Sequence, residues 1–356
     1  GDGVGYRYPH AYAEHWVAQQ YLPNGLQGQV FWQPGPLGWE GQRRTQLQRR
    51  RAAQLAAAAE HEAELGEVLS SSPEDPALER WLQRQLASEG ERLDQLRARL
   101  WQGANWQRHD RTLILEARSL LWALDPLQHC PEGGVVIQAA GAEEVLRLQG
   151  QLQVLDSLGR PAILSGAASA LAPQLEPGQR FEWLVGRHPF RQLSPSELEQ
   201  ALASLSALAA PGAQLRLLFS SSQLGPAGAL LKRPDCPPAL RERLEAVAAL
   251  EPQWMATTPE PSELDALLRV QGWLPPTWQR WQESLELTLS PGLIERWLGP
   301  EASYRRQLAQ LLNTKEINRL RQALEAMAGV SLPQRLQHQL LMARHEKAPA
   351  QPGPIH

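Results

Sequence analysis

The turn after the first expected strand is where this chain could hold a ligand. Residues 111–116 have the pattern of a buried strand, and the turn after them reads Glu116-Ala117-Arg118-Ser119. Nucleotide-binding sheets place glycines in this turn, because the polar end of the ligand must approach the backbone closely. The next strand, 135–138, ends in Gln138, whereas such sheets place an acid there to hold a ribose diol. The side chains of the turn and the uncharged Gln138 predict a site that no longer fits its cofactor.

A second polar group follows the strand expected at 181–186. Arg187, His188 and Arg191 come after its carboxyl end, where α/β sheets place their chemistry. Two guanidinium groups and an imidazole could contact an anion. The alternative, which we favour, gives His188 a turn role before Pro189, because turns commonly use such residues.

The strongest basic run of the chain lies before the α/β pattern. It consists of Arg43, Arg44, Arg49, Arg50 and Arg51. These five cations could neutralise nucleic-acid phosphates. The alternative, which we favour, is a solvated helix face next to the acidic Glu60, Glu62 and Glu64.

Other catalytic and metal-binding patterns are missing from the sequence. The nine histidines are scattered, with no HExxH, and the two cysteines, Cys130 and Cys236, form no CxxC pair. We therefore expect no metal and no catalytic residue, and a reducing, cytoplasmic location. None of the lysines follows glycine or precedes Ser or Thr, so the chain has no Walker-type phosphate loop.

Composition limits the class further. The chain has 356 residues, of which 42% are hydrophobic, and a formal net charge of -3. This length allows one large domain or two, and this charge excludes a uniformly basic nucleic-acid binder. No run approaches the roughly 18 apolar residues of a membrane span, so we expect no membrane contact.

Strand and helix patterns alternate through the second two thirds of the chain. Strands are expected at 111–116, 135–138, 160–166, 181–186 and 214–219, with helices at 143–158 and 195–208. Two later strands, 278–289 and 336–344, flank helices at 291–298 and 303–328. This order predicts an α/β fold with a mostly parallel sheet and a late antiparallel strand pair.

We place this α/β domain at 105–347, and three other segments surround it. Residues 1–40 are rich in Gly, Pro, Tyr and Trp without apolar periodicity, which predicts an irregular aromatic tail. Residues 41–104 predict a connector of two amphipathic helices, whose apolar faces consist mainly of leucines at helical spacing. Residues 348–356 predict a disordered tail.

Short motifs in the aromatic tail are more specific than its composition. They are Gly5-Tyr6-Arg7-Tyr8-Pro9-His10, His15-Trp16-Val17, Gln19-Gln20-Tyr21-Leu22-Pro23, Leu26-Gln27-Gly28 and Val30-Phe31. They resemble the C-terminal end of RarA (MgsA) proteins, the replication-associated recombination AAA+ ATPases. The resemblance implies an upstream motor that uses ATP and Mg, and helices that assemble a tetramer. It also implies a role in DNA replication, recombination and repair at stalled forks, through DNA or replication proteins.

The α/β region carries a second set of motifs. They are Trp106-Gln107-Arg108-His109, Pro131-Glu132-Gly133-Gly134-Val135, Val185-Gly186-Arg187-His188-Pro189 and Pro211-Gly212. Their order resembles the class I S-adenosylmethionine-dependent methyltransferase fold, which is Rossmann-like. In detail it resembles the methyltransferase-like domain fused behind RarA in cyanobacterial sequences. The departures at Glu116, Ala117, Arg118, Ser119 and Gln138 imply that this copy does not bind S-adenosylmethionine.

Together, these resemblances predict a C-terminal fragment of a RarA-like replication and recombination factor. Its methyltransferase-like domain is expected to be a non-catalytic interaction or scaffolding module, since a fold does not by itself imply an activity. The alternative is a working methyltransferase with an unusual cofactor turn.

Overall fold

The computed structural model describes residues 53, 56–57, 59–60, 90–152, 160–191, 193–232, 236, 238–254, 259–300 and 302–346. The aromatic tail at 1–40, the arginines at 43–51 and the tail at 348–356 lie outside these residues. What the sequence predicts for the structure of these segments therefore stays a prediction.

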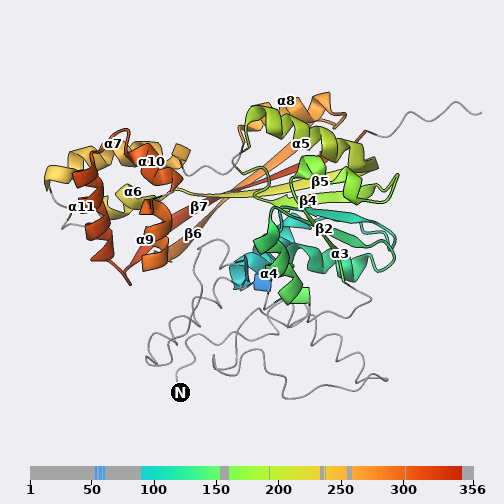
Figure 1. Ribbon diagram of the computed structural model, residues 1–356, viewed down its shortest axis with the longest axis horizontal. Coiled ribbons are helices and arrows are strands. Elements are labelled where there is room, and N and C mark those ends of the chain that lie inside the picture. The colour runs from blue at the N-terminus through green and yellow to red at the C-terminus, as the bar shows by residue number, and fades with distance from the viewer. Residues whose placement is uncertain are drawn as a thin grey trace, which may run out of the picture.

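A single seven-stranded sheet organises the described residues (Figure 1). Its strands are β1 (Thr112–Leu115), β2 (Val135–Ala139), β3 (Ala162–Ser165), β4 (Phe181–Arg187), β5 (Ala209–Ser222), β6 (Thr277–Thr288) and β7 (Ser331–Arg344). They lie in the order β3-β2-β1-β4-β5-β7-β6. The first five strands are parallel, and β7 runs antiparallel to both β5 and β6. The predicted α/β fold with a late antiparallel pair is confirmed.

Both faces of the sheet are covered, which explains why apolar and polar residues do not alternate in β1 and β2. On one face lie α5 (Pro195–Leu208), α8 (Pro261–Val270) and the 3-10 turns η6 (Ala168–Ala170) and η7 (Ala172–Gln174). On the other lie η4 (Leu121–Ala123), α3 (Leu124–His129) and α4 (Ala142–Leu152) (Figure 1). Every residue of β1 and β2 is buried between these layers.

Two helical segments from the expected connector pack in the same core as η4 and α4. One contains Ala53, Ala56, Ala57, Ala59 and Glu60, and the other covers 90–100. The C-terminal end of the second segment contacts the sheet through Arg216 of β5. The Arg216 guanidinium donates hydrogen bonds to the carbonyls of Leu100 (2.8 Å) and Gln102 (2.9 Å). Carbonyls at a helix end lack intrahelical partners, so a cation there stabilises the helix terminus.

A separate helical lobe forms where β5, β6 and β7 extend beyond the rest of the sheet (Figure 1). Its helices are α6 (Pro226–Leu231), α7 (Pro238–Trp254), α9 (Pro291–Leu298), α10 (Ser303–Leu308) and α11 (Thr314–Glu325). They surround a hydrophobic core of their own, which includes Leu244, Ile294 and Leu320. The lobe is therefore built from two connections, β5 to β6 and β6 to β7.

The structure corrects two sequence predictions and adds three helices. The helix expected at 303–328 is two helices, because Asn313 starts α11 with a capping box that includes Glu316. Strand β5 starts at Ala209 rather than 214, since Pro211-Gly212 lies in a bulge with a register shift against β4. Helices α6, α7 and α8 were not predicted.

Candidate ligand edge of the sheet

The carboxyl ends of β1, β2 and β4 lie side by side, because these strands are parallel neighbours. We call these strand ends, with the turns that follow them, the ligand edge. Open α/β sheets bind their ligands at this position. The edge brings together the two predicted groups, the turn after β1 with Gln138 and the residues after β4.

Gln138 uses its side-chain amide to join backbone groups. Its Oε1 accepts a hydrogen bond from the Glu116 N–H at 2.7 Å, and its Nε2 donates to the Gly166 carbonyl at 2.7 Å. The ends of β1, β2 and β3 are thereby fixed to one another. The amide atoms of Gln138 are engaged at the place where a ribose diol would need an acid.

Glu116 joins the end of β1 to the turn after β4. It has a positive φ of 44°, and its Oε1 accepts a hydrogen bond from the Phe190 N–H at 2.9 Å. Burial raises the pKa of the Glu116 carboxyl, while the Phe190 N–H and the charges of Arg118 and Arg191 act against this rise. A positive φ in a residue that is not glycine is uncommon and is held in place by its surroundings.

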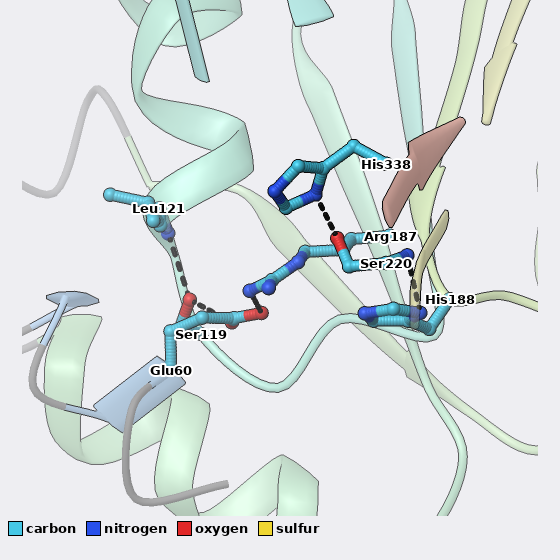
Figure 2. Close-up of polar contacts among 7 residues, drawn as sticks. All are labelled: Glu60, Ser119, Leu121, Arg187, His188, Ser220 and His338. Atoms are coloured by element: carbon cyan, nitrogen blue, oxygen red, sulfur yellow. Dashed lines mark hydrogen bonds and ion pairs between the residues drawn. The ribbon is translucent and has the colours of Figure 1, made fainter. Parts of the chain in front are cut away.

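Ser119 and Arg187 share a buried partner, Glu60 (Figure 2). The Arg187 guanidinium lies 2.9 Å from Glu60 Oε1, with the two side chains 1% and 4% exposed. The Ser119 hydroxyl donates a hydrogen bond to Glu60 Oε2 at 2.7 Å and accepts one from the Leu121 N–H at 3.2 Å. A carboxylate from the helical segment that contains Ala59 and Glu60 therefore lies between the turn after β1 and the end of β4.

This position of Glu60 was not predicted. The sequence favours a solvated acidic face for Glu60, but its side chain is buried in the core. Glu60 and Arg187 are 127 residues apart, so no local pattern connects them. The one available signal is that Glu60 ends a run of four alanines, a helix face that can approach a sheet closely.

His188 has the turn geometry that the sequence favours. Its φ is 50°, its N–H donates to the Leu218 carbonyl at 2.8 Å, and its Nδ1 faces the Ser220 N–H at 3.4 Å. Burial is the main reason that the pKa of His188 lies well below its usual value, and the neighbouring arginines add to the effect. An anion contact by Arg187, His188 or Arg191 stays a prediction, and the anion that Arg187 does contact is Glu60.

A further polar chain crosses the sheet beside the ligand edge. The Ser220 hydroxyl lies 2.8 Å from His338 Nδ1, and His338 Nε2 lies 2.9 Å from Glu283 Oε2. Serine, histidine and acid at these distances are the elements of a nucleophilic triad. Ser220, however, lies inside β5 and its N–H faces His188, so that N–H cannot serve as an oxyanion donor. Ser220, His338 and Glu283 lie on the neighbouring strands β5, β7 and β6. Their side-chain hydrogen bonds therefore connect these three strands.

The described residues contain neither a metal-binding cluster nor a membrane-spanning helix. No cluster of three His, Cys, Asp or Glu side chains with metal-binding geometry occurs among them. None of their helices combines the length and the apolar character needed to cross a membrane.

The strand order and the position of the ligand edge define the class of the α/β region. It is a Rossmann-like sheet of the class I methyltransferase type, with β7 inserted antiparallel between β5 and β6. The turn after its first strand carries side chains instead of glycines.

A family model supports the other half of the predicted fusion. Residues 1–51 match the family described as MgsA AAA+ ATPase C terminal, so the resemblance of the tail is confirmed. The match includes the predicted nucleic-acid candidates Arg43 to Arg51. No curated protein sequence matches the chain.

Solved structures similar to this chain include several methyltransferases. A putative sarcosine dimethylglycine methyltransferase from Galdieria sulphuraria has 11% identity and a TM-score of 0.40, over 73% of this chain and 88% of its own. The YcgJ protein from Bacillus subtilis has 14% identity and a TM-score of 0.41, over 72% and 98%. Geranyl diphosphate C-methyltransferase from Streptomyces coelicolor A3(2) has 11% identity and a TM-score of 0.40, over 80% and 87%. The fold class rests on the strand order and not on these scores.

Proposed function

We propose that this chain is the C-terminal part of a RarA-like replication and recombination factor, and that its methyltransferase-type domain is a non-catalytic interaction or scaffolding module. The observation that carries the proposal is the Glu60–Arg187 ion pair with Ser119 at the ligand edge. A carboxylate buried there occupies the space between the turn after β1 and the end of β4.

The remaining contacts of the edge support the same function. The side-chain amide of Gln138 forms hydrogen bonds to backbone groups through both its oxygen and its nitrogen, and the Glu116 carboxylate accepts a hydrogen bond from the Phe190 N–H. In addition, Ala117, Ser119, Leu120 and Leu121 are all buried. A cofactor would have to break these contacts before it could make its own. The RarA-like assignment is supported by the match at residues 1–51.

The wider assignment follows from the same resemblance. ATP and Mg belong to the motor of the full-length protein, and assembly as a tetramer belongs to its helices. The partners are DNA or replication proteins, and the location is the cytoplasm. The arginines at 43–51 are the candidates for phosphate contacts.

Calorimetric titration with S-adenosylmethionine tests the non-catalytic role. The proposal predicts no binding in the micromolar range, because side chains fill the edge. A micromolar dissociation constant, or methyl transfer to nucleic acid or protein, would support the alternative of a working methyltransferase.

A further inference from the structure

We propose that the ligand edge has become a docking site for a helix of the same chain, and that this docking fixes the RarA-like tail to the α/β core. The docked helix contains Ala53, Ala56, Ala57, Ala59 and Glu60. The inference deepens the proposed function and rests on it, since an edge occupied by a cofactor could not also hold Glu60.

The face of the docked helix fits a close approach. Ala53, Ala56, Ala57 and Glu60 follow i, i+3, i+4, i+7 spacing, which places them on one side of a helix. Their exposed fractions are 4%, 0%, 6% and 3%. Because alanine carries only a methyl group, the helix backbone can lie near the core while Glu60 extends further into it.

The receptor for Glu60 is assembled from two separate elements. Arg187 ends β4, and Ser119 follows β1 and starts the segment that leads into η4. Each binds a different oxygen of the Glu60 carboxylate. A side chain held from both sides in this way recognises an acid specifically, because a neutral residue cannot balance the buried Arg187 charge.

Undocking is opposed by the same charges. The Arg187 side chain is 1% exposed, and its guanidinium lies 5.3 Å from the Trp122 ring. If Glu60 leaves, the buried Arg187 guanidinium loses this carboxylate. Removing one partner of a buried ion pair is strongly unfavourable, so the docked helix should open rarely.

The position of the docked helix in the chain gives this contact its consequence. The match to the MgsA C-terminal family ends at Arg51, two residues before Ala53. A helix fixed at the ligand edge therefore fixes the point where the RarA-like segment joins the core. The edge that would hold a small molecule in a related fold would act here as the anchor between two parts of one protein.

Amide hydrogen exchange on the whole chain tests the inference. Glu60→Gln keeps the size of the side chain but removes its charge, and Glu62→Gln makes the same change two residues away as a control. We expect amides at 53–60 to exchange at least about tenfold faster in Glu60→Gln than in the unaltered chain or in Glu62→Gln. Exchange in α7 and α9 of the helical lobe should be unchanged, which shows that the chain is still folded.

Equal exchange at 53–60 in all three proteins would overturn the docking inference. If Glu60→Gln lost its fold, Glu60→Asp replaces it, because a shortened carboxylate keeps the charge but should still accelerate exchange at 53–60. Titration of the same proteins with S-adenosylmethionine separates this outcome from a failure of the proposed function. Micromolar binding overturns the non-catalytic role, whereas unchanged exchange without binding overturns only the docking.

Discussion

Glu60 and Glu251 are both buried carboxylates. Glu60 connects the N-terminal segment to the sheet, whereas Glu251 connects helices within the helical lobe. Glu60 pairs with a cation, Arg187, and with Ser119 at the ligand edge. Glu251, in α7, accepts hydrogen bonds from the N–H groups of Ala227 (2.7 Å) and Gly228 (3.0 Å) and from the Tyr304 hydroxyl (2.5 Å).

The difference shows what each contact holds together. The donors to Glu251 lie at the start of α6 and in α10, so Glu251 joins the two connections that form the helical lobe. Its approach to α6 is so close that a Cβ at Gly225 would lie 2.4 Å from its carboxyl carbon. Glu60 instead joins the N-terminal segment to the sheet, across 127 residues. Interfering with Glu251 should therefore affect the lobe, and interfering with Glu60 should affect the attachment of the tail.

The largest effect is expected from Arg187→Met. This change leaves the Glu60 carboxylate buried without its cation and should lower the free energy of unfolding by about 3–5 kcal/mol. Urea unfolding measures this loss. Arg147→Met is the control, since Arg147 pairs with Glu143 on an exposed helix face, where such pairs contribute under about 1 kcal/mol. Equal effects of the two changes would mean that the buried pair is not important for stability.

Glu251→Gln should cost somewhat less, about 2–3 kcal/mol, because one carboxylate oxygen is replaced by an NH2 group that faces donors. The expected site of damage is different. Hydrogen exchange should accelerate in α6 and α10, while amides of β1 and β4 keep their protection. Acceleration at the ligand edge as well would show that the lobe and the sheet unfold together, and the contrast between the two carboxylates would then be lost.

Deleting one hydroxyl from each site compares the two directly. Ser119→Ala and Tyr304→Phe each remove one hydrogen bond to a carboxylate, and Ser119→Ala also removes the hydroxyl that accepts from the Leu121 N–H. Each change should cost about 1.5 kcal/mol in urea unfolding. Ser119→Ala should accelerate exchange at 53–60, and Tyr304→Phe should not. If both changes act on the same amides, the two sites belong to one cooperative unit.

The smallest effect concerns pH. Burial lowers the pKa of His188 in the folded protein, so protons bind the unfolded chain first as pH falls. The contribution of His188 to the free energy of unfolding is therefore complete above pH 6.5 and falls below it, by about 1 kcal/mol between pH 6.5 and 5.5. His188→Asn, which tolerates a positive φ, should remove this loss. An identical pH dependence of unfolding in both proteins would show that His188 does not titrate as its burial requires.

Local sequence signals predicted the elements that depend on local physics. The Ser194/Glu197 capping box and Pro195 set the start of α5, which the structure confirms at 195–208. Helices α6, α7 and α8 begin at Pro226, Pro238 and Pro261, so prolines at the first helical position could have revealed them.

The ligand edge could be predicted only in part. The turn after β1 and Gln138 were identified because they depart from a pattern that lies within short segments. Glu60 was not, because its burial depends on Arg187 and Ser119, which are distant in sequence and become neighbours only when the sheet forms. The polar chain through Ser220, His338 and Glu283 depends in the same way on the pairing of three strands.

The central claim, that the ligand edge is held by Glu60 through its charge, is tested most directly by a double-mutant cycle. Unfolding free energies of Glu60→Gln, Arg187→Met and the double variant are compared with that of the unaltered chain. Because the double variant buries no unbalanced charge, it should be more stable than the sum of the single effects predicts, by about 2 kcal/mol or more. A coupling of less than about 0.5 kcal/mol would contradict the claim, since the two residues would then act independently.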